Sequence, residues 1–301
     1  MTEEPTFLFG VGATKAGTSW LWRYLADHPE CHFRAIKELH YFDTVAQNRF
    51  DGALRRARAD LVEQTRRVAD GAAAANPAQA GRKHQKLRDL QEWVAVLARR
   101  APDIAAYRAY LTGGRGARRV VGDVTPAYAL LPVEQLRDMA DVARDVRFVY
   151  LMRDPVARLW SHVRMLARRL AGVDDYAGAA LALIRRICAG DASGDAGGIV
   201  ARGDYAGALA RLDAAVDPAR LLVMFQEDLM TLPGVARLCG FLGIATKAAR
   251  FDMLVHAGVP LALPVAERDA ARAFLRPQYD AVARRFGDLP EAWHMNAGGV
   301  A

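Results

Sequence analysis

The sequence predicts an α/β protein in three layers, α/β/α, with a central and mostly parallel sheet. Four short apolar runs are typical of buried strands, namely 6–11, 119–123, 147–152 and 220–225. Stretches with helical periodicity separate these runs, and strands that alternate with helices indicate a doubly wound sheet. A glycine-rich turn follows the first run, which predicts a P-loop-like nucleotide-binding core at the start of the chain.

Helical patterns follow the first and third apolar runs directly. Residues 19–27 carry apolar side chains at helical spacing, and residues 155–170 carry a continuous apolar stripe of period 3.6. In doubly wound sheets, ligands bind at the carboxyl ends of the strands. The turns that precede these two helices are therefore the first places to look for a site.

Residues 46–118 interrupt the alternation of strands and helices. This stretch is rich in alanine and arginine and has no strand pattern, so we expect a helical insertion within a single domain spanning 1–301. The expected helices lie near 51–70, 84–100 and 103–111. The link 71–81 and the segment 189–198 are expected to be mobile loops, candidate lids on the acceptor side, although solvated surface loops explain both.

Composition describes an ordinary globular chain with an excess of positive charge. The 301 residues are 52% hydrophobic and 25% charged, and the net charge is +7 with a pI of about 9.5. This charge suits a polyanionic ligand, but an arginine-rich composition explains it equally well. The N-terminus has no basic leader, and no apolar run approaches the length of a membrane helix, so we expect a cytoplasmic protein without a membrane span.

Cysteine and histidine give no sign of a disulfide framework or a metal site. Cys31, Cys188 and Cys239 are scattered and odd in number, which predicts buried free thiols in a reducing compartment. Neither residue type has the spacing of metal ligands, so we expect no metal.

The segment FGVGATKAGTSWLWRYL, residues 9–25, predicts a cradle for a phosphate-like group. Gly12 and Gly17 permit a tight turn, and amides at the start of the following helix can hold an anion. Thr18 and Ser19 can add hydroxyl donors. Lys15 precedes the second glycine, whereas a Walker loop has its lysine directly after that glycine. A glycine turn without a ligand is the alternative.

This loop resembles the 5′-phosphosulfate loop of the sulfotransferases that use PAPS, 3′-phosphoadenosine 5′-phosphosulfate. In that family a lysine precedes a small residue, glycine, threonine and a serine or threonine. The resemblance implies that PAPS is the co-substrate, that PAP is the product, and that no metal takes part. It also implies nucleotide contacts from Lys15, Ala16, Gly17, Thr18, Ser19 and Trp20, with Lys15 catalytic.

A second anion site is predicted in VYLMRDPVARLWSHV. Arg153 lies at the carboxyl end of a strand pattern, and Ser161 follows eight residues later on the next helix. A planar guanidinium and a hydroxyl can converge on one phosphate. The segment is similar to the 3′-phosphate motif of the same family, so Arg153 and Ser161 are expected to bind that phosphate. Alternatively, Arg153 pairs with Asp154 and Ser161 faces solvent.

The loop AIKELHYFD offers a candidate general base. A carboxylate beside apolar neighbours has a raised pKa and can accept a proton, which makes Glu38 the candidate. The segment resembles the Lys-Glu-x-His-aromatic-Phe stretch of the heparan-sulfate or glycosaminoglycan-type and bacterial members of the family. That resemblance implies Glu38 as the base and His40 as a supporting or alternative base. A surface ion pair between Lys37 and Glu38 is the competing interpretation.

A fourth segment, VVGDVTPAYALLP, departs from the family pattern. Asp123, Thr125 and Tyr128 match, but Val124 stands where the family has a lysine that would help to hold sulfate or acceptor charge. Asp123 is also the nearest candidate for a Walker-B-like carboxylate, and a core or capping role suits it equally.

Taken with the resemblance, these segments predict sulfuryl transfer from PAPS to a hydroxyl or amine of a carbohydrate or other small-molecule acceptor. A P-loop-like kinase or NTPase is an alternative, but it needs a lysine after the second glycine and a pair of Mg²⁺ ligands. A PAPS- or anion-binding protein without catalysis is another alternative, because of Val124. A nucleic-acid partner is not expected, since arginine is spread over helices instead of being interleaved with aromatic residues on one face.

Overall fold

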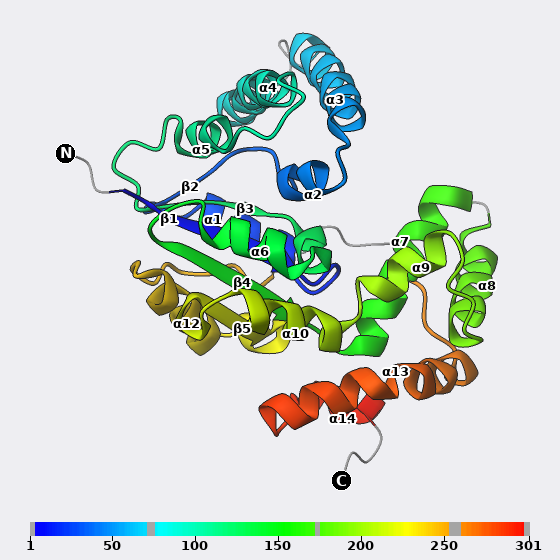
Figure 1. Cartoon of the computed structure of the whole chain (residues 1–301). Helices are drawn as coiled ribbons and strands as arrows, with labels where there is room; N and C mark the ends of the chain where they lie inside the picture. The colour runs from blue at the N-terminus through cyan, green and yellow to red at the C-terminus, as the bar shows by residue number, and fades with distance from the viewer. Residues whose placement is uncertain (1–3, 71–75, 172–174, 253–259, 298–301) are drawn as a thin grey trace.

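The structure is a computed structural model that describes residues 4–70, 76–171, 175–252 and 260–297. Five parallel strands form one sheet in the order β2-β3-β1-β4-β5, flanked by helices, so the predicted α/β fold is confirmed (Figure 1). The strands are β1 Thr6–Gly12, β2 Cys31–Phe33, β3 Val120–Val124, β4 Val146–Met152 and β5 Leu221–Phe225. Four of them were predicted. The edge strand β2 was missed because three residues are too few to show a pattern.

The order of the strands places a change of direction of the chain at the centre of the sheet. Central β1 pairs with β3 on one side and with β4 on the other, with Phe9 beside Asp123 and Gly12 beside Tyr150. The chain leaves β1 towards β2 but leaves β3 towards β4, in the opposite direction. Such a reversal leaves room for a ligand between the two diverging connections. Because β1 and β4 are parallel neighbours, the loops that follow these two strands emerge side by side at the carboxyl edge of the sheet.

Helices cover both faces of the sheet. On one face lie α1, Thr18–Ala26, and α12, Leu232–Leu242, which meet where the Tyr24 hydroxyl lies 3.2 Å from the Cys239 sulfur. On the other face α6, Val133–Ala140, packs on β4 and against α10, Tyr205–Ala215. Right-handed crossovers require this division, because the connections that follow β1 and β3 run in opposite directions.

The expected insertion is helical, and it lies above the sheet in Figure 1. Its helices are α3 Phe50–Asp70, α4 Pro77–Leu97 and α5 Ile104–Thr112. The expected loop at 71–81 is wrong beyond Asn76, because α4 begins at Pro77, where proline suits the first helical turn. Residues 71–75 lie outside the described part. A buried ion pair from Arg34, just after β2, to Asp89 on α4 (3.0 Å) ties the insertion to the sheet.

A second group of helices extends from β4. It contains α7 Pro155–Ala171, α8 Tyr176–Cys188, α9 Asp195–Ala201, α13 Val265–Phe286 and α14 Glu291–Ala297. The predicted helix at 155–170 is confirmed. The expected loop at 189–198 is partly wrong, because its second half is the start of α9, where buried Ala196 and Ile199 anchor the helix.

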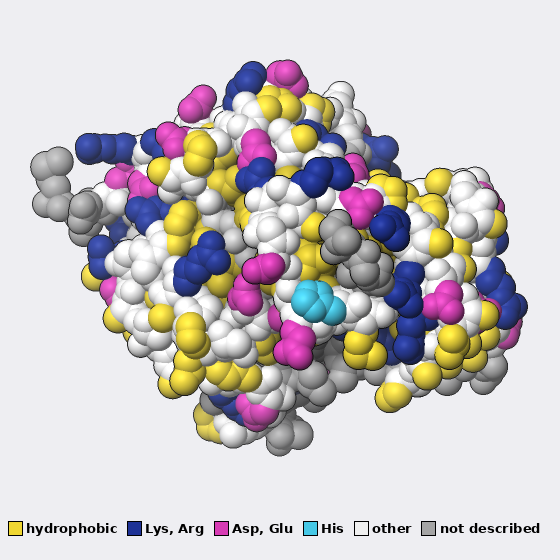
Figure 2. Space-filling view, turned by 90° about the horizontal axis from the view of Figure 1, so that it is seen from below, with side chains coloured by type: hydrophobic (Ala, Val, Ile, Leu, Met, Phe, Trp, Pro, Cys, Tyr) yellow, Lys and Arg dark blue, Asp and Glu magenta, His cyan; other side chains and the backbone are white. Residues whose placement is uncertain are grey.

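The shorter elements are α2 Tyr41–Ala46, α11 Gln226–Leu229 and two 3₁₀ helices, η1 Pro126–Leu130 and η2 Pro218–Arg220. All three cysteines are free; Cys31 and Cys239 are buried as expected, but Cys188 at the end of α8 is half-exposed. Over the described ranges, every helix is too short or too polar to cross a bilayer. The face seen from below carries acidic and basic side chains interspersed (Figure 2).

Candidate active site

The loop between β1 and α1 has the backbone expected of an anion cradle. Gly17 initiates α1 with φ 91°, a left-handed conformation that glycine adopts without strain, and no side chain caps the helix. Uncapped first-turn amides are free to donate to a ligand. Ala16 is fully buried and its amide donates to the Ala13 carbonyl (3.1 Å), so this residue shapes the loop and does not present a free group to a ligand. The loop also packs closely on the end of β5, since a Cβ at position 17 would lie 3.1 Å from Cγ of Gln226.

Lys15 presents a cation without a carboxylate partner. Its backbone has φ 71°, and its ammonium lies 3.8 Å from the Met165 sulfur. Among the residues that the structure describes, no carboxylate oxygen lies within 4.0 Å of the Lys15 ammonium. Burial lowers the pKa of Lys15, and the neighbouring charges of Arg153 and Arg164 lower it further. The charge of Glu38 raises this pKa but does not outweigh the other influences. A half-buried ammonium with two guanidinium groups nearby favours an anionic ligand.

Arg153 lies beside the first loop, as the strand order requires. Its guanidinium is 3.5 Å from the carbonyl oxygen of Lys15. The hydroxyl of Tyr205 fixes the backbone here, because it donates to the Arg153 carbonyl (2.6 Å) and accepts from the Arg153 amide (3.2 Å). The two predicted anion sites, about 140 residues apart in sequence, are thus neighbours in space.

Asp154 is engaged elsewhere, which argues against the simple ion pair with Arg153. Its carboxylate accepts from the amide of Ala157 (2.7 Å), from the Tyr279 hydroxyl (2.6 Å) and from the side chain of Asn296 (3.0 Å). It therefore caps α7 and joins it to α13 and α14. Ser161 lies in the second turn of α7 and is partly exposed.

The loop that carries Glu38 and His40 has an unusual backbone. Both residues have positive φ, 62° and 55°, and together with Lys15 they make three of the five non-glycine residues with this feature in the described chain. Each such residue costs about 1–3 kcal/mol, and such strain gathers at functional sites. The Glu38 carboxylate forms an ion pair with Lys37 and is 42% exposed, so it is not enclosed by apolar groups.

His40 is held by a carboxylate that the sequence interpretation missed. Its Nδ1 lies 2.7 Å from Oδ2 of Asp43, and its Nε2 lies 3.9 Å from Oε2 of Glu38. Burial lowers the pKa of His40, but the hydrogen bond and charge of Asp43, followed by the charges of Glu38 and Asp123, outweigh burial and raise the pKa overall. The spacing of three residues between His40 and Asp43 could have indicated this contact, because side chains at that spacing lie on the same side of a helical turn.

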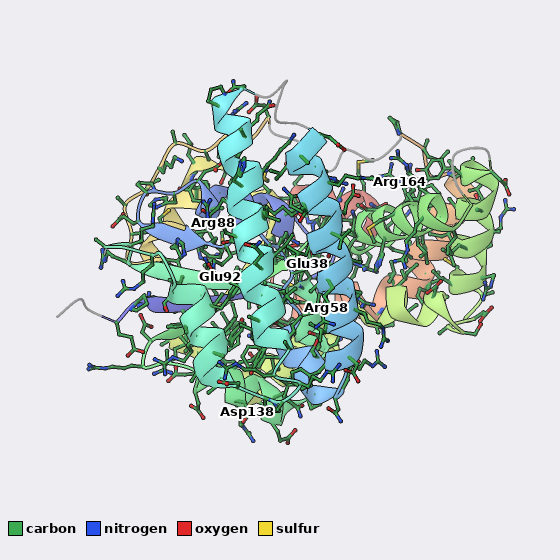
Figure 3. The ribbon with its side chains drawn as sticks, turned by 90° about the horizontal axis from the view of Figure 1, so that it is seen from above. Glu38, Arg58, Arg88, Glu92, Asp138 and Arg164 are labelled. Carbon is green, nitrogen blue, oxygen red and sulfur yellow. The ribbon has the colours of Figure 1, made fainter. Side chains whose placement is uncertain are left out.

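Two further side chains near Lys15 were also missed. Arg164 lies one helical turn beyond Ser161 on α7, and Gln226 lies directly after β5. Figure 3 looks down on the α3–α4 hairpin, which lies over Glu38, with Arg164 on α7 to one side. The spacing of Ser161 and Arg164 could have indicated that both lie on the same face of helix α7. Nothing in the sequence indicates that Gln226 lies beside Gly17.

Trp20 does not project into an open cleft. It is 5% exposed, stacks on Tyr24 (centroids 5.4 Å apart) and on Phe251 (5.8 Å), and donates its indole N–H to the Arg250 carbonyl (3.0 Å). A small cavity of about 100 Å³ borders Trp20, Tyr24 and Lys247. The predicted contact between Trp20 and a nucleotide would therefore be limited to the small part of the indole ring that is exposed.

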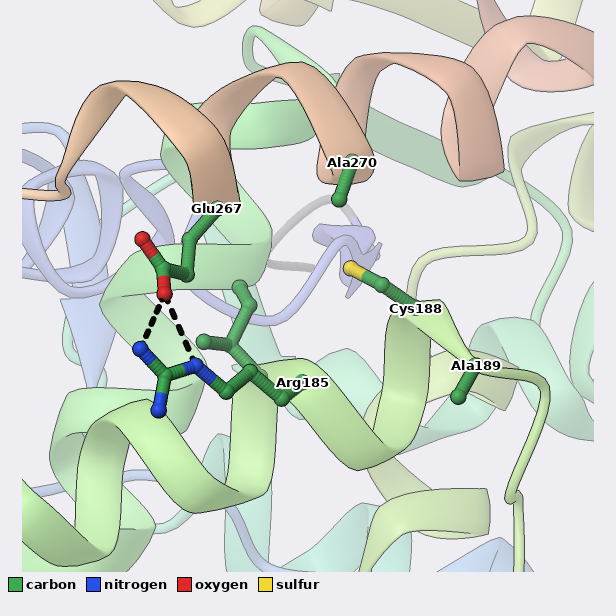
Figure 4. Close-up of a pocket in the computed structure, with 6 residues that line it drawn as sticks. Arg185, Cys188, Ala189, Glu267 and Ala270 are labelled. Carbon is green, nitrogen blue, oxygen red and sulfur yellow. Dashed lines mark hydrogen bonds and ion pairs between the residues drawn. The ribbon is translucent and has the colours of Figure 1, made fainter.

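A separate cavity of about 230 Å³ lies between α8 and α13, away from the loops described above (Figure 4). Arg185 and Glu267 line this cavity and form an ion pair with each other (2.5 Å), and Cys188 also lines it. Across the described ranges, no three histidine, cysteine or acidic side chains gather in a way that could hold a metal ion.

The fold and this grouping of cations define an α/β protein with a candidate anion-binding site at the carboxyl edge of a parallel sheet. The chain belongs to the sulfotransferase family, whose family model matches residues 5–248. The resemblance inferred from the four sequence segments is thus confirmed at the level of the family. The sequence matches none of the curated proteins with which it was compared.

One solved structure in particular supports the same fold. A crystal structure of a sulfotransferase from Alicyclobacillus acidocaldarius is 22% identical, with a TM-score of 0.62 over 97% of this chain and 99% of that chain. Sulfotransferase domains from the curacin biosynthetic pathway and from the Synechococcus PCC 7002 olefin synthase are each 18% identical with TM-scores of 0.48. The former match covers 81% of this chain and 76% of that chain, the latter 95% and 96%.

Proposed function

We propose that the protein transfers a sulfuryl group from PAPS to a hydroxyl or amine of a small-molecule or carbohydrate acceptor. The observation that carries the proposal is the approach of Arg153 to the Lys15 carbonyl at 3.5 Å. Because the two anion sites are this close together, they suit two phosphate groups of one adenosine nucleotide. Membership of the sulfotransferase family supports the same conclusion.

The residues present fit such a donor. The uncapped start of α1, with Thr18 and Ser19, would hold the 5′-phosphosulfate, while Arg153 and Ser161 would hold the 3′-phosphate. No carboxylate of the described residues forms an ion pair with Lys15, so its charge would be available to the donor. When bound, PAPS supplies a sulfuryl group on a phosphate leaving group, and transfer of this kind proceeds by in-line displacement through a loose transition state.

The protein's own residues would contribute to catalysis by positioning the donor and the acceptor and by stabilising the charge that develops during transfer. Lys15 would neutralise the charge that develops on the bridging oxygen, from a site already ordered before reaction. Glu38 would accept the acceptor's proton, since its carboxylate is exposed and borders the Lys15 site. His40 is the weaker candidate base, because its hydrogen bond to Asp43 favours the protonated imidazole.

A ligand titration distinguishes the proposed sulfotransferase function from that of a P-loop-like kinase or NTPase. The full-length chain is titrated with 3′,5′-ADP and, in parallel, with ATP plus Mg²⁺, and its thermal midpoint is followed. The proposal expects stabilisation by 3′,5′-ADP and little by ATP, because only the former carries a 3′-phosphate for Arg153. Stabilisation by ATP plus Mg²⁺ alone would contradict the proposal.

Catalysis and the acceptor need a second experiment. The protein is incubated with PAPS and fractionated metabolites or oligosaccharides, and mass spectrometry is used to find products that gain one SO₃ group. Such a product, absent when PAPS is omitted, would support transfer. Tight 3′,5′-ADP binding without any such product would favour a nucleotide-binding protein that lacks catalysis, as the valine at position 124 also allows.

A further inference from the structure

A fully buried carboxylate lies directly beneath the loop of Glu38 and His40. Asp123 is on β3 and is 3% exposed. It accepts hydrogen bonds from the hydroxyls of Thr125 (2.7 Å), Tyr128 (2.7 Å) and Tyr107 (3.1 Å). A buried carboxylate with this many donors is strongly fixed in position, because each donor replaces water lost on burial.

The fourth donor to Asp123 comes from the candidate catalytic loop itself. The amide of Leu39, which lies between Glu38 and His40, is 3.4 Å from Oδ1 of Asp123. One residue beyond His40, the amide of Tyr41 donates to the hydroxyl of Tyr128 at 2.9 Å. The Tyr128 hydroxyl thus accepts from the loop and donates to Asp123, and it connects the two.

These two bonds hold a backbone that is unfavourable on its own. Glu38 and His40 both have left-handed φ values, which non-glycine residues adopt at a cost unless the surroundings impose them. The amides that follow these two residues are the ones that bond to Asp123 and Tyr128. The positive φ values are therefore stabilised by hydrogen bonds at neighbouring peptide groups.

We infer that Asp123 and Tyr128 are positioning residues: they hold the Leu39 and Tyr41 amides and so fix the directions of the Glu38 and His40 side chains. This assignment rests on the proposed function for its catalytic meaning, because Glu38 and His40 are the proposed acceptor-side groups. It gives Asp123 a role other than that of a Mg²⁺ ligand, since four protein donors already occupy its two oxygens.

The chain offers a matched pair of variants. Tyr107 and Tyr128 both donate to Oδ2 of Asp123, and both are fully buried. Tyr107 contacts the loop only through its ring, which stacks on Tyr41 with centroids 4.3 Å apart, and phenylalanine keeps that ring. Tyr128→Phe removes the bond to the Tyr41 amide as well, so only this variant releases the loop.

The test needs no acceptor. In the full-length chain labelled at histidine, the titration of the His40 imidazole is followed by NMR and assigned by its loss in His40→Gln. Hydrogen exchange of the Tyr41 amide is measured in the same samples. Tyr128→Phe should move the His40 pKa towards its ordinary value of about 6.5 and speed Tyr41 exchange at least about tenfold. Tyr107→Phe should leave both unchanged.

Equal shifts in the two variants, or no shift in either, would overturn the inference. Asp123→Asn should act like Tyr128→Phe, and if it fails to fold the tyrosine pair still decides. Binding of 3′,5′-ADP, measured by calorimetry, should be the same in wild type and in both tyrosine variants. A wild-type chain that binds no 3′,5′-ADP would count against the proposed function, whereas the His40 result would still decide whether the loop is held as inferred.

Discussion

The side chain of Val124 packs directly over the α-carbon of Gly10 on the neighbouring strand. A Cβ at position 10 would lie 2.8 Å from a Val124 methyl group, and Val124 is 1% exposed. The position where the family pattern has lysine is therefore part of the apolar core in this chain. Lys37 lies close enough to Lys15 to lower the pKa of its ammonium, but Lys37 itself forms an ion pair with Glu38.

Restoring the family lysine should therefore harm the protein. We expect Val124→Lys to reduce the free energy of unfolding by several kcal/mol, because an ammonium would be buried without a partner. Val124→Met is the control, since it adds similar length without charge and should cost about 1–3 kcal/mol through overpacking. Urea denaturation measures both. Equal losses in the two variants would show that size, and not charge, is what this position excludes.

Removing the Lys15 ammonium should slow the chemical step. Lys15→Ala is expected to cost about 3 kcal/mol in the activation barrier, or roughly two orders of magnitude in kcat, as loss of one preorganised donor does. The measurement is the rate of SO₃ transfer from PAPS to an acceptor found by mass spectrometry. Lys83→Ala, near the start of helix α4 in the insertion, serves as the control. Normal turnover by Lys15→Ala would refute the role assigned to this residue.

Arg153 should discriminate between nucleotides that differ only in the 3′-phosphate. Arg153→Ala is expected to weaken binding of 3′,5′-ADP about 10–100-fold, the value of one or two charge-assisted hydrogen bonds. Binding of 5′-AMP should change little, because that ligand lacks the group. Calorimetry with both ligands measures the difference. If the two affinities fell by the same factor, Arg153 would act on the loop of Lys15 and not on the 3′-phosphate.

The His40–Asp43 pair should make stability depend on pH. Because the pKa of His40 is raised in the folded state, the pair stabilises the fold fully below about pH 6.5, the ordinary value for histidine, and loses that contribution as pH rises through the raised pKa. Asp43→Asn should therefore reduce the free energy of unfolding more at about pH 5.5 than at about pH 8.5. In a His40→Gln background the Asp43→Asn effect should no longer differ between these two conditions; a persisting difference would locate the titration elsewhere.

The buried pair that ties α4 to the sheet should matter far more than ion pairs on the surface. Asp89→Ala removes the buried carboxylate that binds both the Arg34 guanidinium and the Ala35 amide, and it leaves Arg34 with the half-exposed carboxylate of Glu92. The expected cost is about 3–5 kcal/mol in urea denaturation. Glu63→Ala removes the exposed pair with Arg67 within α3 and should cost less than about 1 kcal/mol. Similar losses would mean that the insertion is held by other contacts.

The glycine turn before α1 and the strand end at Arg153 could be predicted from the sequence because their signals are local. Glycine at position 17 marks a left-handed turn, and the turn joins a buried strand to an amphipathic helix. Arg153 likewise sits where an apolar run ends and a proline opens a helix. In both cases neighbouring residues alone determine the backbone, so the pattern is visible in one dimension.

Only the tertiary structure decided how these local pieces meet. The pairing of β2 with β3 made a strand of residues 31–33, and the same edge of the sheet brought Asp123 under the loop of Glu38 and His40. The sequence alone determined a parallel α/β fold with a glycine turn between its first strand and first helix, since periodicity and the use of glycine follow from backbone sterics. Hydrogen bonds between residues 84 positions apart, such as Leu39 to Asp123, depend on strand order and register, which short-range patterns do not encode.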